Sequence, residues 1–215
     1  MAWLEFQTAS GGAILRRQLF TANGTWTKSD KIVGDQVFIT AIGGGGSGNN
    51  SFDAWGGCSG AYITRFPVDV SGTPSESITV GVGGALVNGA GTNTAGNAGA
   101  PSSFGNLVSV DGAVAASDST IYVSSLNGQN PGGKFLCSIP GFFGAAIAAY
   151  SGASDEDCGG SGLILDTSGK KGGDAFRKQP GGNGYGAGGG GCNDNTIDSG
   201  AGAPGAVLVE WLEKA

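Results

Sequence analysis

The sequence predicts an all-β fold, and two features of its composition predict it. Short runs rich in β-branched and aromatic residues are bounded by Gly, Asn, Ser or Pro, which is the pattern of a sandwich or barrel. The 215 residues also include 45 glycines, gathered largely between those runs. Hydrophobic residues make up 39% of the chain, which excludes a wholly disordered polar chain. Collagen is excluded because no strict G-X-Y period is present.

The strands are predicted from six segments of this kind. They are Gln36–Ile42, Gly60–Val70, Ser77–Val82, Leu107–Val114, Ile121–Ser124 and Gly205–Leu212. The best helix candidate, Phe142–Tyr150, has a glycine inside and no clear cap, so it predicts a buried loop or one or two helical turns. Trp26 and Trp211 are predicted to lie in strands and to be core or interface residues.

Glycine-rich segments separate these strands. They are Gly43–Gly48, Gly56–Gly60, Gly83–Gly99, Gly159–Gly162, Gly181–Gly191 and Gly200–Gly205. Flexible linkers are one interpretation of such sequence. However, these segments lie between consecutive strands of one core. The alternative is ordered packing as polyproline-II helices, whose backbone groups point sideways and bond to neighbours that approach closely because no Cβ intervenes. We expect this packing.

Charge and histidine content exclude several classes of function. The chain has 11 basic and 17 acidic residues, a net charge of −6 and no histidine. Nucleic-acid and anionic-membrane binding need clustered Lys or Arg, so both are disfavoured. Without histidine there is no Ser-His-Asp triad, Cys-His pair or histidine-bearing zinc site. No run of 18 apolar residues predicts a membrane span.

The four cysteines predict buried thiols made in a reducing cytoplasm rather than disulfides. Cys58, Cys137, Cys158 and Cys192 are scattered and form no C-x-x-C motif, although two disulfides remain an alternative. The first residues, MAWLEFQTASGG, have no basic region followed by an apolar region, so no secretory signal is expected.

A series of motifs runs from Phe20 to Leu212. They are FTANGTWT, a strand running into GGGG, GGCSGAYITRFPVDVSGTPSESITVGVGGA, a G-x-P-S-S-F-G segment, the run Gly181–Gly191 and GAPGAVLVEW. In this order they resemble the glycine-rich C-terminal domains of tailed-phage tail fibres and tail-tip adhesins. A similar arrangement occurs in glycine-rich extracellular domains of some animal receptor kinases, which combine a jelly-roll-like sandwich with a bundle of polyproline-II glycine helices.

The resemblance implies a jelly-roll-like β-sandwich with glycine-rich loops packed as polyproline-II helices. It implies an adhesin domain at residues 20–215, preceded by an attachment segment at residues 1–19. In that segment Trp3, Leu4, Phe6, Ile14 and Leu15 are available to dock on a partner. It also implies a homotrimer, located in the virion at a tail fibre or tail tip and made in the host cytoplasm. The middle portion, Asn127–Lys178, departs from the family because it is less dense in glycine.

Three motifs are interpreted structurally. Gly43, Gly45 and Gly48 match the dinucleotide motif G-x-G-x-x-G, but no helix-forming sequence follows to hold a pyrophosphate. The acidic cluster Ser154–Asp157 and the pair Asp194 and Asp198 are expected to be solvated loops, with a metal site as the alternative. No cofactor or metal is predicted.

Candidate contacts with a receptor come from loops. Large rings supply binding area at low entropic cost, which selects Phe52, Trp55 and Tyr185. The segment Lys170–Lys178 is either a solvated loop or a patch for an anionic glycan. The candidate loops are Asn49–Trp55, Ser154–Asp157, Lys170–Lys178 and Asn193–Asp198. The candidate residues are Phe52, Trp55, Asp155, Asp157, Lys171, Arg177, Tyr185, Asn193 and Asp194.

The sequence with its resemblance therefore predicts a receptor-binding protein that attaches a virion to a host cell-surface protein, pilus or glycan, and not an enzyme. One alternative is a structural tail component, a fibre cap or connector, that makes no receptor contact. The other is a depolymerase of surface polysaccharide, which the absence of histidine and of a paired-acid motif disfavours.

Overall fold

The computed structural model describes residues 6–7, 12–51, 56–89, 94–115, 184–192 and 198–215. These residues form two antiparallel β-sheets and contain no helix, which confirms the predicted all-β class. The five-stranded sheet has the order β1 (Phe6–Gln7), β2 (Ala13–Phe20), β9 (Ala206–Lys214), β4 (Ile32–Ile42) and β5 (Tyr62–Asp69). The four-stranded sheet has the order β3 (Gly24–Thr27), β6 (Ser75–Thr79), β7 (Ser102–Phe104) and β8 (Val108–Val110).

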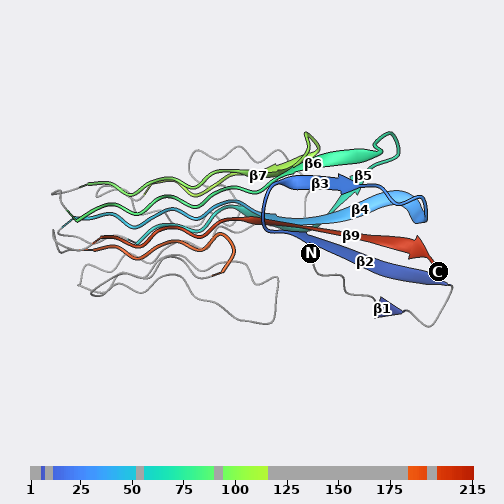
Figure 1. Cartoon of the computed structure of the whole chain (residues 1–215), viewed down its shortest axis with the longest axis horizontal. Coiled ribbons are helices and arrows are strands. Elements are labelled where there is room, and N and C mark those ends of the chain that lie inside the picture. The colour runs from blue at the N-terminus through green and yellow to red at the C-terminus, as the bar shows by residue number, and fades with distance from the viewer. Residues whose placement is uncertain (1–5, 8–11, 52–55, 90–93, 116–183, 193–197) are drawn as a thin grey trace.

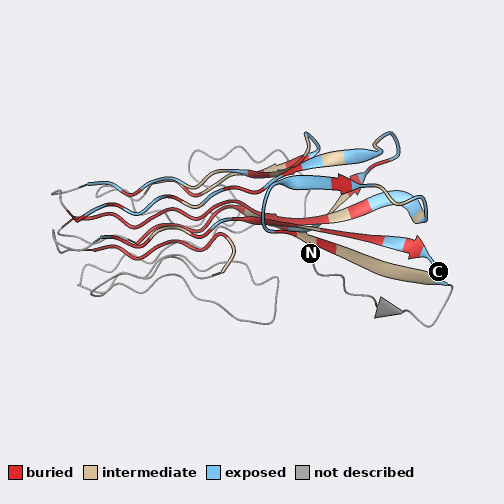
Figure 2. Cartoon of the chain, viewed as in Figure 1, coloured by how far each residue is buried: buried red, intermediate tan, exposed pale blue. Residues whose placement is uncertain are grey.

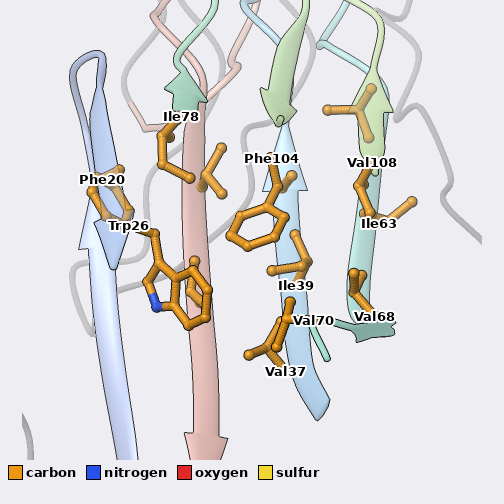
Figure 3. Close-up of a cluster of buried hydrophobic side chains, with 14 of the residues drawn as sticks. Phe20, Trp26, Val37, Ile39, Ile63, Val68, Val70, Ile78, Phe104 and Val108 are labelled. Carbon is orange, nitrogen blue, oxygen red and sulfur yellow. The ribbon is translucent and has the colours of Figure 1, made fainter. Parts of the chain in front are cut away.

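The two sheets enclose one apolar core, whose aromatic centre is Trp26 (Figure 3). Its indole ring lies 5.5 Å from the Phe104 ring and 6.0 Å, edge-on, from the Trp211 ring. Both tryptophans are buried, which confirms the expectation that they are core residues. Aromatic pairs at such distances add about 0.5–1.5 kcal/mol to the free energy of burial. The aromatic centre therefore ties β3 of one sheet to β9 of the other.

The period of two along β9 decides which side chains enter this core. Val207, Val209 and Trp211 point inward and are buried. Glu210 points to the other face of the sheet, yet only 2% of it is exposed. Its carboxylate lies 2.7 Å from Arg17 Nε and 3.5 Å from Arg65 Nη1, so the buried charge is paired. The outer face of the five-stranded sheet is therefore charged as well as apolar.

Most predicted strands exist, with shifted ends. The strand predicted at Leu107–Val114 spans only Val108–Val110, and the one at Ser77–Val82 ends at Thr79, because the chain continues into glycine-rich structure in both places. Ile121–Ser124 and Phe142–Tyr150 lie outside the described residues.

Strands β1, β2 and β7 were not among the predicted strands, and β3 was expected only through the prediction that Trp26 lies in a strand. β2 pairs with β9 along its whole length, from Ala13 opposite Lys214 to Phe20 opposite Val207. The predicted boundary between residues 19 and 20 therefore falls inside a strand, and the second half of the predicted attachment segment belongs to the sheet. The centre of β2, Arg16 to Gln18, is polar. Because Arg16 and Gln18 both lie on the inner face, the sequence of β2 lacks the alternation of apolar and polar residues that predicts a strand.

Figure 1 shows how the molecule is laid out. The sheets occupy one end, and glycine-rich segments leave them as a set of extended runs lying side by side. The C-terminus lies at the end of the sheets that is remote from these runs (Figure 1).

Candidate functional site

The glycine-rich runs form a bundle around one buried run. We call residues 43–51 the central run, and the central run with runs 56–61, 81–89, 94–101, 111–115, 184–192 and 198–205 the glycine bundle. Every residue of the central run is buried (Figure 2). It continues directly from β4, so the sheet and the bundle share one continuous chain.

The N–H groups of the central run donate to three neighbouring runs in strict rotation. The donor–acceptor pairs are Gly43 to Ala61, Gly44 to Ala100, Gly45 to Ala203, Gly46 to Cys58, Ser47 to Asn97 and Gly48 to Gly200, with N···O distances of 2.9–3.0 Å. Each neighbour is met at every third residue. The acceptors move back by three residues as the donors move forward by three, so these neighbours are antiparallel to the central run.

The carbonyl groups of the central run accept from the other three runs. Ala113 N–H bonds to Gly44 O at 2.8 Å, Gly84 N–H to Gly45 O at 2.8 Å, and Gly189 N–H to Gly46 O at 2.9 Å. Six runs therefore surround the central run and satisfy its backbone groups, as buried amides require. Segments that read as flexible linkers are here ordered by hydrogen bonds to one another.

Close approach of these backbones explains why the positions are glycine. A Cβ atom at Gly45 would lie inside 3.0 Å of Ala187 O, and one at Gly48 inside 3.0 Å of Gly190 O, closer than real Cβ atoms come to any neighbour. The same holds, against backbone oxygens, at Gly43, Gly44, Gly57, Gly60, Gly81, Gly83, Gly84, Gly99, Gly112, Gly189, Gly202 and Gly205. The glycine pattern therefore records which residues face a neighbouring carbonyl.

The end of the bundle remote from the sheets, which we call the far end, brings together Asn50, Thr94, Cys192 and Asp198. Asn50 and Thr94 exchange backbone hydrogen bonds of 3.0 and 2.9 Å. Cys192 N–H donates to Asn49 O, and Ser51 N–H donates to Cys192 O, each at 3.0 Å. Gly89 N–H donates to Asp198 Oδ1 at 3.0 Å. Ser51, Gly89, Thr94, Cys192 and Asp198, which are the described residues that flank positions 52–55, 90–93 and 193–197, therefore lie at one end of the bundle.

Buried polar side chains replace glycine near the far end. Ser47 Oγ accepts the Asn97 N–H at 2.7 Å and donates to Gly48 O at 3.2 Å. Asn49 Nδ2 donates to Ser51 Oγ at 3.3 Å. Polar groups suit this interior because its walls are peptide groups rather than apolar side chains. The sequence signal for these residues was a serine or asparagine inside a glycine run. The prediction that Asn49–Trp55 is a contact loop did not use this signal, and the structure shows that residues 49–51 are buried.

Ser199 and Asp198 brace the neighbouring run. Ser199 Oγ accepts the Val87 N–H at 2.9 Å, and Ser199 N–H donates to Val87 O at 2.9 Å. Asp198, considered above as a metal ligand, instead accepts the Gly89 N–H. Within the part of the chain that is described, no group of three or more His, Cys, Asp or Glu side chains is placed to hold a metal ion.

The predicted receptor contacts fall into three groups. Phe52, Trp55, Asn193 and Asp194 lie outside the described residues. Tyr185 is half-buried at the opposite end of the bundle, beside Gly186, whose backbone abuts Ile42 where β4 ends. The structure therefore does not bring Tyr185 to the far end. Asp155, Asp157, Lys171 and Arg177 also lie outside the described residues.

The predicted attachment residues are partly described. Trp3 and Leu4 lie outside the described residues, and Phe6 is in β1, opposite Leu15. Leu15 and Ile14 are half-buried in β2, opposite Leu212 and Glu213 respectively.

The cysteines and the dinucleotide-like motif have structural places in the bundle. Cys58 and Cys192 are buried thiols, and Cys137 and Cys158 lie outside the described residues. Gly43, Gly45 and Gly48 sit in the central run, followed by extended chain to Ser51 and not by a helix. No helix among the described residues is long and apolar enough to cross a membrane.

Comparison with known proteins agrees with this architecture. A search of curated proteins finds no match. A protein-family model described as a glycine-rich domain matches residues 21–212. These residues include strands β3 to β8, most of β9 and the whole glycine bundle. The chain belongs to this family of glycine-rich domains.

Proposed function

We propose that this chain is a phage tail-fibre or tail-tip receptor-binding protein that attaches the virion to a host cell-surface receptor. The observation that supports it is that Ser51, Gly89, Thr94, Cys192 and Asp198, the described residues that flank positions 52–55, 90–93 and 193–197, come together at the far end of a hydrogen-bonded bundle. Loops carried on a rigid base lose little conformational entropy when they bind. On this proposal Phe52, Trp55, Asn193 and Asp194 make contact, and the protein acts by binding and not by catalysis.

We infer further that the runs of the bundle are polyproline-II helices. A helix of that type has three residues per turn and no internal hydrogen bonds. In the central run, N–H groups three residues apart donate to the same neighbouring run, and each of these hydrogen bonds goes to another run. Both features support this inference. The two antiparallel sheets support a jelly-roll-like sandwich as the scaffold from which the helices extend.

The proposed assembly is a homotrimer in the virion, held to other tail proteins at the sheet end. The C-terminus and the paired residues Leu15 and Leu212 lie in that part of the molecule, away from the far end. On the flank of the bundle, Val82 is 69% exposed and Leu86 is 42% exposed, which supports contact with a neighbouring subunit there. Several copies would convert weak single contacts into avid attachment.

Competition for host cells tests the proposal. The purified protein should bind host cells and protect them from the phage, and Phe52→Ala/Trp55→Ala should weaken cell binding about tenfold to a hundredfold, as loss of aromatic anchors does. Leu107→Ala is the matched control, because Leu107 is an exposed apolar residue beside β8, away from the far end of the bundle. Wild-type protein that neither binds cells nor blocks adsorption would refute receptor binding.

Two further measurements separate the alternatives. A cap or connector would enter the virion normally and leave adsorption unaffected when Phe52 and Trp55 are replaced. A depolymerase would release new reducing ends from host polysaccharide, whereas we expect none.

A further inference from the structure

The run 81–89 of the glycine bundle turns every third residue toward solvent. Three of its residues are buried and each accept a backbone hydrogen bond from the run 198–205; they are Gly81, Gly84 and Val87. The residues that directly follow these three are all exposed; they are Val82, Ala85 and Asn88. The period of the run therefore places the side-chain amide of Asn88 in water.

Asn88 is followed by a glycine whose N–H group already donates to a carboxylate. The distance from Gly89 N to Asp198 Oδ1 is 3.0 Å. The side-chain carbonyl carbon of an asparagine can be attacked by the backbone nitrogen of the next residue, and a glycine at that position puts no Cβ in the way. The attack comes from above the peptide plane, whereas the N–H bond lies in that plane. Asp198 can therefore hold the proton while the new bond forms.

We propose that Asn88 is a site of spontaneous deamidation, with Asp198 as the base. A bond forms between Gly89 N and Asn88 Cγ while the proton of Gly89 N passes to the Asp198 carboxylate. The bond from Cγ to the side-chain nitrogen then breaks, and that nitrogen takes the proton from Asp198 and leaves as ammonia. The cyclic succinimide that remains is opened by water, at Cγ to give aspartate or at the backbone carbonyl carbon to give isoaspartate.

Asn23 provides an internal comparison, because it also precedes a glycine. Its Oδ1 accepts the Val80 N–H at 2.8 Å, and Gly24 is paired with Ile78 between β3 and β6. These contacts fix the side chain and the backbone that would have to meet. In the part of the chain that the structure describes, the side chain of Asn88 makes no such hydrogen bond. Asn88 should therefore react faster than Asn23.

The reaction would loosen the far end of the bundle. Isoaspartate continues the chain through its side chain, which adds a carbon atom to the backbone between Val87 and Gly89. On one side of this point Val87 and Ser199 share two hydrogen bonds of 2.9 Å, and on the other side Gly89 bonds to Asp198. A longer backbone cannot keep both contacts in register. The inference does not rest on the function proposed for the far end.

Peptide mapping by mass spectrometry tests the site. The full-length protein is incubated in heavy-oxygen water, either folded or in urea, and then digested in ordinary water, so that only products of the incubation carry the label. In the folded protein Asn88 should deamidate at least about tenfold faster than Asn23, because tenfold is about 1.4 kcal/mol and the contacts of Asn23 must break first. In urea the two rates should converge, because both residues precede glycine.

Two variants test the base and the consequence. Asp198→Asn keeps an acceptor for the Gly89 N–H but cannot take its proton, so deamidation at Asn88 should slow at least about tenfold. Asn88→Asp is the matched control for the product, because it adds the carboxylate without lengthening the backbone. Its amides at Val87 and Ser199 should exchange slowly, whereas wild-type protein that contains isoaspartate should exchange them rapidly.

Several results would overturn the proposal. A folded wild-type protein in which Asn88 reacts no faster than Asn23 would remove the site. A folded Asp198→Asn protein with an unchanged or raised rate at Asn88 would remove the role of Asp198 as the base, and unchanged exchange in the isoaspartate form would remove the loosening. The comparison of Asn88 with Asn23 uses the wild-type protein alone, so it decides the site even if Asp198→Asn does not fold.

Discussion

Replacing Gly48 by alanine distinguishes ordered packing of the glycine bundle from a flexible linker, because the two interpretations predict changes in stability of opposite sign. In a flexible linker, Gly→Ala stabilises a protein by about 0.4–1 kcal/mol, because it reduces the freedom of the unfolded chain. In this structure the added Cβ would lie inside 3.0 Å of the backbone carbonyl of Gly190 and of Gly191 N. No flexible side chain is there to move aside, so whole backbones must separate.

The cost follows from the bonds that the shift would break. Gly48 N–H bonds to Gly200 O at 3.0 Å, and Gly190 O accepts the Gly200 N–H at 2.8 Å. Two buried bonds lost at about 1–3 kcal/mol each, with about 1–3 kcal/mol for overpacking, give a destabilisation centred on about 6 kcal/mol. For a chain of this size the melting temperature should fall by about 12–24 °C.

Thermal and urea unfolding, followed by near-ultraviolet circular dichroism of the core tryptophans, measure this change. Gly72→Ala is the matched control, because a Cβ at Gly72 meets nothing within 4 Å, and it should be neutral or slightly stabilising. A Gly48→Ala protein that is as stable as the Gly72→Ala protein would refute the packing argument.

Three further outcomes are expected. Ser47→Ala removes the acceptor of the Asn97 N–H and should lower the free energy of unfolding by about 1–3 kcal/mol in urea titrations, whereas Ser71→Ala on the surface should change it little. Burial raises the pKa of Glu213, but hydrogen bonds from Ser29, Trp211 and Arg16 outweigh it and hold the pKa below the ordinary 4.5. Stability from this group is therefore complete above pH 4.5 and is lost as pH falls through the lower folded pKa, so Glu213→Gln should flatten the acid limb of the stability curve. Amides of residues 43–48 should exchange as slowly as those of β4 and β9, and exchange at the rate of an unstructured peptide would contradict the bundle.

Much of the sheet architecture could be predicted from the sequence, because burial of one face of a strand imposes a period of two on its apolar residues. Gln36–Ile42 and Gly205–Leu212 alternate around apolar residues, and both lie within the central strands β4 and β9. β2 was missed because its inward positions include Arg16 and Gln18, which are stabilised by specific partners such as Glu213 and not by an apolar pattern. Long-range pairing overrode the local signal there.

The candidate site at the far end was likewise predictable only in part from the sequence. Phe52, Trp55, Asn193 and Asp194 were selected because the sequence predicts loops there, but nothing in their spacing says that the nearby described residues Asn50 and Cys192, about 140 positions apart, meet. That meeting depends on Asn50, Thr94 and Cys192, which exchange hydrogen bonds across three runs. Tyr185 was grouped with them by composition alone. Its run is parallel to the central run, so Tyr185, near the start of its run, lies at the sheet end of the bundle.

Composition and local pattern by themselves determined that the described part of the chain is all-β, that its described glycine runs are ordered, and that Trp26 and Trp211 are buried. These properties depend on residue type and on near neighbours in the chain. Only the tertiary structure decided which run lies in the centre of the bundle and which runs end together at its far end. A glycine permits close approach from any direction, so its partner is chosen by the assembled backbone and not by the glycine itself.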